Sequence, residues 1–406
     1  MDFKNEKDII EYAFNMGCSN CQIILTEIEK VQISLISVGV KKVKNIIRKY
    51  NIQLVYENRY INLSIESDEI TDYSKLIKYA IQHCYYKVDD YQINEVFKSQ
   101  LYSDVDKKKF NTDILKVALD KKNEIEEQFK CKVNTLVFET TYISKNCIRI
   151  NNIYTNNSTY ITAGFVAQKD NKLPCTYLID NFSGNIDSID SLVLKSKLEA
   201  KDIIIMEELK GKVKFSYNAV KRLLEYLVNM FNAEYILNNR CKVKKNFLNK
   251  NIFNEYISLS INNIYSFDYE GVCSSNKYLI KDGIILDFLN NIRTQKIIGG
   301  TAGDVKVINL TNDFTLGVSD LLLIIKKKSN NEYNVNINEI DGQETIFDLR
   351  TGVISIVCYG YEGNNKNELH KYRKSIDLID LMNKAKVCSG NKLLGNYNVP
   401  EFIIEI

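Results

Sequence analysis

Apolar and polar residues alternate with a period of two through much of this chain, and this pattern constrains its fold more than any other feature. A β-strand points successive side chains to opposite faces, so each alternating run predicts a strand with one buried face. The polar step at residues 57–59 separates two such runs and predicts a hairpin. The alternating apolar positions are Val31, Ile33 and Leu35, then Ile52, Leu54 and Tyr56, then Ile61, Leu63 and Ile65.

Segments with apolar residues at helical spacing lie before and after these predicted strands in the sequence. Residues 7–16 form one helical pattern that stops at Gly17, and residues 73–84 form another. A third helix is predicted to begin after Thr112 as its N-cap. Strand-like runs separated by Asn, Asp and Ser then fill residues 133–180. A helix, a strand hairpin, a helix and a meander predict an α+β domain, not a βαβ repeat.

The length of 406 residues allows two domains with separate cores. Ser216 is predicted to cap a helix that opens the second half, and strand-like runs dominate from residue 256 to the C-terminus. We therefore expect an α+β fold with an N-terminal α+β domain over residues 1–195. We expect a mostly antiparallel, β-rich C-terminal domain over residues 196–406.

Composition excludes several classes of protein. Lys and Arg number 54 against 51 Asp and Glu, and a net charge of +3 does not favour nucleic acid or membrane as a partner. No run approaches the ~18 uncharged apolar residues of a membrane helix. The first residues, MDFKNEKDII, lack the apolar segment of a signal peptide. Ten cysteines without a secretion signal suggest reduced thiols, so we expect a cytoplasmic protein.

Four short motifs follow one another in the second half: Asp-Tyr-Glu-Gly at 268–271, an Asp-Gly turn at 282–283, a small-residue cluster at 299–303 and a Thr-Gly step at 351–352. In this order and spacing they resemble the TldD/PmbA family, described as modulators of DNA gyrase and understood as zinc-dependent peptidases. The residues that carry the resemblance are Asp268, Glu270, Gly271, Gly283, Gly300, Thr301, Gly303, Thr351 and Gly352.

The resemblance also implies where a zinc site would lie. In the metal-bearing branch, a helix after the domain boundary carries two histidines five residues apart, with a glutamate after the first and a cysteine far downstream. Alignment of residues 215–235 places Glu225 and Met230 at the histidine positions and Tyr226 at the glutamate, while Cys388 falls in the region of the cysteine. A thioether is a poor Zn²⁺ ligand, and tyrosine is a weak base at neutral pH. The resemblance therefore implies the PmbA/TldE branch, which lacks the zinc ligands.

The resemblance to that branch implies that this chain is a non-catalytic subunit without a cofactor of its own. We expect it to pair with a metal-bearing TldD-like subunit, and we expect zinc in that partner. Their C-terminal domains enclose a chamber for unstructured peptide, with apolar strand positions at Leu321, Leu323 and Ile325 either at the interface or in the core. Two alternatives stay open: a homodimeric peptide-binding or scaffold protein, and an enzyme of altered chemistry that uses Glu225, Asp268, Glu270 or a cysteine.

Other candidate sites favour structural roles. Cys18 and Cys21 form a CxxC without a second pair at comparable spacing, so we expect both to be buried. His83 and His370, the two histidines of the chain, are expected to be structural or exposed. The run IGGTAGD lacks the Lys-Ser/Thr of a phosphate loop. Two carboxylates at alternate positions, as at 268 and 270, suit either an acid–base pair or the bracing of a tight turn.

Overall fold

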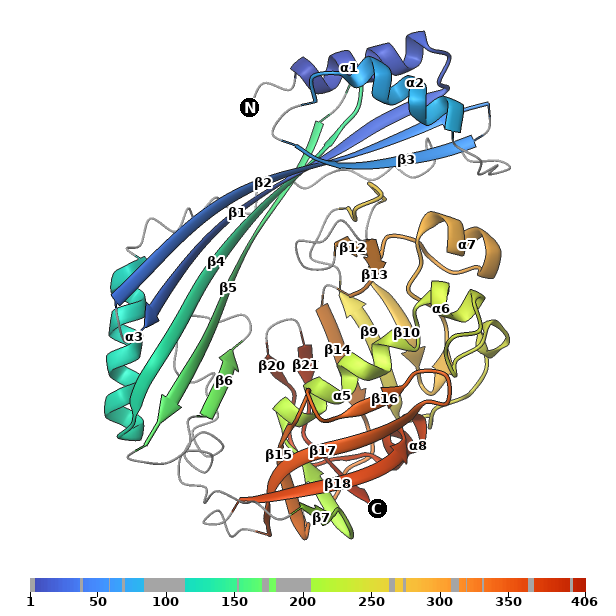
Figure 1. Ribbon diagram of the computed structural model, residues 1–406. Helices are drawn as coiled ribbons and strands as arrows, with labels where there is room; N and C mark the ends of the chain where they lie inside the picture. The colour runs from blue at the N-terminus through green and yellow to red at the C-terminus, as the bar shows by residue number, and fades with distance from the viewer. Residues whose placement is uncertain are drawn as a thin grey trace.

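The computed structural model describes residues 4–36, 39–57, 59–67, 70–83, 114–151, 153–169, 175–179, 206–262, 267–272, 275–307, 314–318, 320–330, 332–363, 369–394 and 397–406. Figure 1 shows a long, curved sheet in the N-terminal domain and a compact group of sheets and helices on its concave side, which is the C-terminal domain. This arrangement confirms the predicted α+β fold.

The N-terminal domain is one antiparallel sheet of six strands in the order β3-β2-β1-β4-β5-β6. The central strands are unusually long, and β1 and β2 stay paired from Asn20 opposite Val55 to Ile36 opposite Gly39. The elements are α1 (Lys4–Asn15), β1 (Asn20–Ile36), β2 (Gly39–Tyr56), β3 (Arg59–Glu66), α2 (Tyr73–His83), α3 (Ile114–Phe129), β4 (Lys132–Ile148), β5 (Ile153–Gln168) and β6 (Cys175–Ile179).

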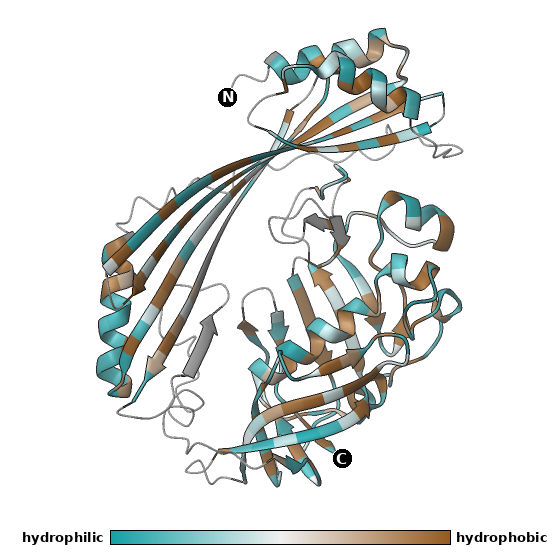
Figure 2. Ribbon diagram, in the orientation of Figure 1, coloured by the Kyte–Doolittle hydropathy of each residue, from teal (hydrophilic) through white to brown (hydrophobic). Residues whose placement is uncertain are grey.

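Helices cover two ends of one face of this sheet. At one end α1 and α2 pack on Ile23 and Leu25, and at the other end α3 packs on Ile33 and Leu35. All four residues have odd numbers in β1, so they lie on the same face of the strand. In Figure 2 brown and teal residues alternate along these long strands. The opposite face of the same strands is turned toward the C-terminal domain (Figure 1).

The C-terminal domain contains a six-stranded sheet, β11-β10-β9-β14-β21-β20, and the pair β12-β13. It also contains an eight-stranded sheet, in which seven strands follow the order β19-β22-β8-β15-β17-β18-β7 and the eighth, β16, pairs with β17. Its helices are α5 (Tyr217–Asn229), α6 (Ala233–Leu237), the 3₁₀ turn η3 (Lys245–Phe247), α7 (Ile292–Ile298) and α8 (Leu378–Lys384). Its strands are β7 (Met206–Glu208), β8 (Lys212–Phe215), β9 (Ile257–Asn262), β10 (Lys277–Lys281), β11 (Ile284–Ile285), β12 (Val305–Val307), β13 (Phe314–Leu316), β14 (Asp320–Ile325), β15 (Val335–Ile340), β16 (Ile346–Asp348), β17 (Val353–Glu362), β18 (His370–Asp377), β19 (Lys386–Val387), β20 (Lys392–Leu394), β21 (Tyr397–Val399) and β22 (Phe402–Glu405).

Helix α5 fills the core of the C-terminal domain. Ser216 caps it, since the hydroxyl of Ser216 accepts a hydrogen bond from the backbone N–H of Ala219, as the sequence predicted. Apolar side chains at helical spacing then form its buried face. These core residues are Ala219, Val220, Leu223, Leu224, Leu227 and Val228. Leu321, Leu323 and Ile325 of β14 are buried in the same core, so of the two roles considered for them the core role is correct.

The described part of the C-terminal domain adds two details to the sequence predictions. The strands β7 and β8 precede α5, and residues 180–205, where the domain was expected to begin, lie outside the described residues. Both strands are too short for an alternating pattern to reveal them. The strand pairs of this domain are mostly antiparallel, as expected, and the pairs β14–β21, β15–β8 and β18–β7 are parallel. The expected boundary at 195/196 and the N-cap candidate Thr112 lie outside the described residues.

Among the helices of the described residues, none is both long enough and apolar enough to cross a membrane.

Candidate functional site

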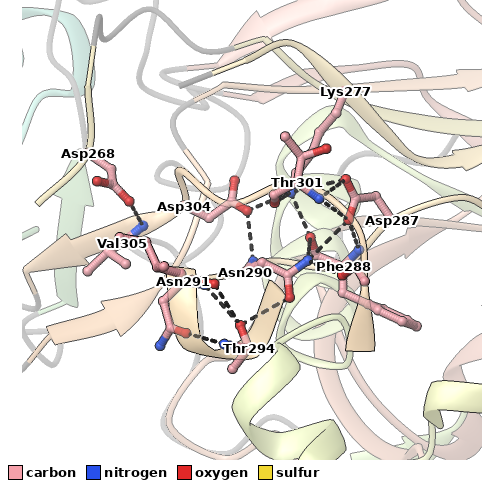
Figure 3. Close-up of polar contacts among 12 residues, drawn as sticks. Asp268, Lys277, Asp287, Phe288, Asn290, Asn291, Thr294, Thr301, Asp304 and Val305 are labelled. Atoms are coloured by element: carbon pink, nitrogen blue, oxygen red, sulfur yellow. Dashed lines mark hydrogen bonds and ion pairs between the residues drawn. The ribbon is translucent and has the colours of Figure 1, made fainter. Parts of the chain in front are cut away.

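The Asp-Tyr-Glu-Gly motif forms a tight turn, residues 267–272, held by the carboxylate of Asp268. One oxygen of this carboxylate accepts hydrogen bonds from the backbone N–H groups of Glu270 and Val272, at 2.8 and 3.0 Å. The other oxygen accepts from the backbone N–H of Val305 at 3.0 Å (Figure 3). Gly271 has a φ of +73°, a conformation that glycine adopts without steric cost. Asp268 therefore braces the turn before Gly271.

Glu270 connects this turn to helix α7. Its carboxylate oxygen Oε2 accepts a hydrogen bond of 2.8 Å from the backbone N–H of Ile292, the first residue of α7. Burial, and next the negative charge of Asp268, raise the pKa of Glu270 to about 8. Burial likewise raises the pKa of Asp268 to about 6, against the lowering effect of its backbone hydrogen bonds. Near neutral pH, Glu270 therefore holds a proton for most of the time.

The 267–272 loop docks on the inner face of the N-terminal sheet. Three backbone carbonyl groups of the loop accept hydrogen bonds from side chains of three adjacent strands, β4, β2 and β1. The pairs are Lys145 Nζ with the carbonyl of Phe267 at 3.3 Å, Asn51 Nδ2 with that of Tyr269 at 2.9 Å, and Gln22 Nε2 with that of Glu270 at 2.8 Å. The sheet thus contacts the backbone of the loop through polar side chains, and this contact joins the two domains.

Lys145 is the cation of this domain contact. Its ammonium lies 3.8 Å from the centre of the Tyr269 ring, within the range of a cation–π interaction. Burial lowers the pKa of Lys145 to about 8, although the charge of Asp268 acts in the opposite direction. Lys145, Asp268 and Glu270 therefore all titrate between about pH 6 and about pH 8.

A second polar cluster anchors the small-residue loop next to this turn. The ammonium of Lys277 donates to the carboxylate of Asp304 at 2.6 Å and to the carbonyls of Phe288 and Thr301 at 2.7 and 2.8 Å (Figure 3). The carboxylate of Asp287 lies 3.5 Å from the same ammonium and accepts from the backbone N–H of Thr301. Because the charged side chains are buried, each carboxylate depends on Lys277 for its stability.

Gly300 is required where the loop passes Asp287. Its φ is +90°, and a Cβ at this position would lie 2.1 Å from the Asp287 oxygen Oδ1. The motif glycine therefore allows the close approach between the loop and this carboxylate. Gly303, at a φ of +112°, comes directly before Asp304 in the same loop. The structure thus brings residues 268–271 and 300–304 together, through Val305 and α7.

The other motif residues form separate turns. Gly283, in the turn between β10 and β11, has a φ of +80°, and a Cβ there would lie 2.3 Å from the carbonyl oxygen of Phe253. Gly352 has a φ of +75° in the turn before β17, where the hydroxyl of Thr351 donates to the carboxylate of Asp348 at 2.9 Å. These residues shape the C-terminal domain away from the domain contact.

The three positions aligned with the zinc ligands, and Tyr226 at the position of the glutamate base, lie in different environments. Glu225 forms an ion pair with Arg222 on the surface side of α5. Met230, the C-cap of α5, is fully buried in the core. The ring of Tyr226 packs 5.6 Å from that of Phe347. The structure therefore does not bring Glu225 and Met230 to a common point.

Cys388 is half-buried in the segment after β19, where its backbone N–H donates to the carbonyl of Glu401 at 3.0 Å. Burial raises the pKa of its thiol to about 11. Across the described ranges, with their gaps, no three or more His, Cys, Asp and Glu side chains gather closely enough to hold a metal ion.

The remaining candidates take the structural positions expected of them. Cys18 and Cys21 are both buried, and burial raises the pKa of each thiol. The ring of His83 lies 4.3 Å from that of Tyr79, tilted by 44°, at the exposed end of α2. The ring nitrogen Nδ1 of His370 lies 3.0 Å from the Glu207 carboxylate.

Sequence reasoning missed the partners of the 267–272 loop on the N-terminal sheet. Asn51 and Gln53 alternate with the apolar residues of β2, and a period-two pattern marks such positions as a polar face. The structure buries both of them, with 4% and 0% of their surface exposed. The available signal was a strand face rich in amide side chains, opposite an apolar face. This signal does not reveal whether the amide side chains contact solvent or another polar part of the protein.

Comparison with known proteins agrees with this architecture. Residues 209–405 match the model of the PmbA/TldA metallopeptidase C-terminal domain. No curated protein sequence matches the chain.

Three solved structures are similar over nearly the whole length. A putative modulator of a DNA gyrase from Thermotoga maritima has a TM-score of 0.75 at 16% identity, covering 100% of this chain and 99% of its own. A putative modulator of DNA gyrase from Bacteroides thetaiotaomicron has a TM-score of 0.76 at 15% identity, with 99% and 97% covered. TldE from Thermococcus kodakarensis has a TM-score of 0.76 at 13% identity, with 98% of each chain covered. At these identities the likeness shows the fold. The shared fold and the match of residues 209–405 to the metallopeptidase domain together support the TldD/PmbA family for this chain.

Proposed function

We propose that this chain is the non-catalytic, PmbA/TldE-like subunit of a heterodimeric TldD/TldE-type zinc metallopeptidase. In this role it supplies part of a chamber that holds unstructured peptide for cleavage or maturation. The observation that carries the proposal is the state of helix α5. In the alignment of residues 215–235 this helix corresponds to the zinc helix of the metal-bearing branch, and here Glu225 pairs with Arg222 and Met230 is buried in the core.

The residues present do not fit a zinc ion. A catalytic zinc site needs three protein ligands around one point, with a fourth position open for water. A buried thioether and a surface carboxylate on different sides of α5 do not meet this requirement. We therefore assign zinc and water activation to a metal-bearing partner.

The rest of the C-terminal domain suits a chamber wall. The loops around Asp268 and Gly300 are fixed by hydrogen bonds from backbone N–H groups to the carboxylates of Asp268 and Asp287. The six-stranded sheet ends at β20, which no further strand covers in the described residues. An edge strand can accept an extended peptide through backbone hydrogen bonds, which favours broad tolerance of peptide sequence.

An acid–base role for Asp268 and Glu270 has less support. A general base needs access to the proton that it removes. Asp268 already accepts three backbone hydrogen bonds, and Glu270 caps α7. The remaining alternative is a homodimeric peptide-binding or scaffold protein without peptidase activity, which differs from the first proposal in its partner.

Co-expression with a metal-bearing family member tests the proposal. We expect the two chains to purify as a heterodimer that cleaves unstructured peptide, while this chain alone does not. Glu225→Ala in this chain should leave the cleavage rate of the heterodimer unchanged. Cleavage by this chain alone, abolished by Glu225→Ala, would contradict the proposal. A stable homodimer that binds peptide and ignores the second chain would favour the alternative.

A further inference from the structure

The 267–272 loop is fixed to the two domains by different sets of atoms. Its carboxylates bond the C-terminal domain, where Asp268 accepts from Val305 and Glu270 accepts from Ile292. Its backbone carbonyls bond the N-terminal sheet, through Lys145, Asn51 and Gln22. The loop can therefore leave the N-terminal sheet without losing its hydrogen bonds to the C-terminal domain.

The apolar part of this contact is small. The buried apolar cluster at the loop consists of Ile24 of β1, Cys147 of β4 and Phe267. On the polar side, the Oδ1 atom of Asn51 is buried and finds no hydrogen-bond partner among the described residues, which costs free energy in the docked state. Contacts between domains allow relative motion unless they are large and hydrophobic. Docking of the loop on the sheet is therefore sensitive to the charges within the contact.

Those charges leave an ionised Glu270 at a disadvantage. The ammonium of Lys145 acts on the Asp268 carboxylate and favours its ionised form. The charges that act on Glu270 are those of Asp268 and of Glu234 in α6, and both are negative. An ionised Glu270 therefore meets two carboxylates and, among the described residues, no cation that offsets them. A proton on Glu270 removes this repulsion.

The N-terminal sheet carries two further cations on the same face. Lys49 of β2 lies in one row with Lys145, since both lie opposite Thr26 of β1. Arg149, which follows β4, donates to a side-chain amide oxygen of β1 at 3.2 Å. Neither Lys49 nor Arg149 is among the charges that act on Glu270. The sheet therefore does not compensate the charge of Glu270.

We propose that the 267–272 loop is a proton-dependent switch between the two domains, which holds the N-terminal sheet while Glu270 carries a proton and releases it when Glu270 is ionised. On release, the ionised carboxylate gains water, and the loop carbonyls exchange the side-chain donors of the sheet for water. The bonds of the loop to α7 and to Val305 remain. This proposal does not depend on the role of the chain in a peptidase.

The direction of the switch follows from the pKa shifts. Burial raises the pKa of Glu270 from 4.5 to about 8, so its contribution to docking is fully present below about pH 4.5 and is lost as the pH rises to about 8. Burial also raises the pKa of Asp268 to about 6, and this group acts in the same direction at lower pH. Burial lowers the pKa of Lys145 to about 8, against the charges of Asp268 and Cys147, so Lys145 strengthens docking only above about pH 8. Docking is therefore weakest near pH 8.

Small-angle X-ray scattering of the full chain, from about pH 5.5 to about pH 8.5, tests the switch. We expect the radius of gyration to increase as the pH approaches 8, because the N-terminal sheet separates from the C-terminal domain. The far-UV circular dichroism should stay constant, since both domains remain folded. A constant radius of gyration, or an increase that accompanies loss of the circular dichroism signal, would overturn the proposal.

Variants assign the effect to Glu270. Glu270→Gln keeps an oxygen for Ile292 but cannot ionise, so it should stay compact over the whole range. Glu332→Gln is the matched control and should expand like the wild type, because the Glu332 side chain is 77% exposed and pairs with Lys212. Expansion of Glu270→Gln to the same extent as Glu332→Gln would refute the role of this proton.

A further variant opens the contact without changing Glu270. Asn51→Asp replaces the amide that donates to the Tyr269 carbonyl by a carboxylate, so two acceptors face each other. Its radius of gyration should already be larger than that of the wild type near pH 6.5, with the circular dichroism unchanged. If Asn51→Asp is as compact as Glu270→Gln at every pH, the loop does not hold the domains together and the proposal fails.

Discussion

Replacing Glu270 by Gln is expected to change how stability depends on pH. The folded-state pKa of Glu270, about 8, lies above the ordinary value of 4.5. Between these values the folded chain holds a proton at this site that the unfolded chain has lost. Stability from this group is therefore fully present below about pH 4.5 and is lost as the pH rises to about 8. Glutamine keeps an oxygen for the N–H of Ile292 but cannot titrate.

The size of the effect follows from the same two values. Each pH unit between 4.5 and about 8 corresponds to about 1.4 kcal/mol for one group, so the upper limit is about 5 kcal/mol. Glu270 is only half-buried, so solvent screens part of this amount. Relative to wild type, Glu270→Gln should therefore become progressively more stable as the pH rises, by at most about 5 kcal/mol.

Urea unfolding at a series of pH values measures this difference. The chain has no tryptophan, so far-UV circular dichroism is the suitable signal. Glu332→Gln is a matched control, because the Glu332 side chain is 77% exposed, pairs with Lys212 and is not among the charges that act on Glu270. Its free energy of unfolding should follow the wild-type curve. The reasoning is refuted if the curves of Glu270→Gln and wild type stay parallel from pH 4.5 to about 8.

Three further outcomes are expected. Gly300→Ala places a Cβ 2.1 Å from the Asp287 carboxylate and should lower the free energy of unfolding in urea by about 2–4 kcal/mol. Gly390→Ala is the control and should cost little, because no atom lies within 4 Å of a Cβ at that position. Equal losses in the two variants would contradict the close contact between Gly300 and Asp287. Lys277→Met leaves two buried carboxylates without a counter-ion and should cost about 3–5 kcal/mol in the same assay, so a loss below about 1 kcal/mol would be inconsistent with the cluster. The purified chain should carry no stoichiometric zinc by elemental analysis, and about one zinc per chain that is lost in Glu225→Ala would disprove the non-catalytic assignment.

The period-two pattern located strands well where one face is apolar. Ile33 and Leu35 lie in β1 under α3, and Ile52 and Leu54 lie in β2 against α1 and α2. The first half of β2 gave no such signal, because its side chains up to Arg48 are mostly exposed and many are charged. A strand segment that is exposed on both faces cannot be traced by apolar periodicity alone.

The domain contact could not be predicted for a different reason. Gln22 meets the carbonyl of Glu270 across 248 positions of sequence, and Asn51 meets that of Tyr269 across 218. Amide side chains suit both water and a backbone carbonyl, so residue type does not reveal which one they meet. Gly300 is similar: the small-residue cluster marks a special backbone, but the carboxylate it approaches is visible only in three dimensions.

The arrangement of hydrogen bonds separates a mechanical role from a chemical one for the Asp-Tyr-Glu-Gly motif. Each backbone segment near the turn is fixed by a different part of it: Asp268 holds Val305, Glu270 holds α7, and the loop carbonyls hold the N-terminal sheet. A group that is to move protons for a substrate needs an oxygen available to that substrate. Here the carboxylate oxygens of Asp268 and Glu270 accept hydrogen bonds from the backbone, and they hold the loop whose carbonyl oxygens contact the N-terminal domain. A change at Asp268 should therefore alter the domain contact and stability before it alters any chemistry, as the proposed role in a chamber wall requires.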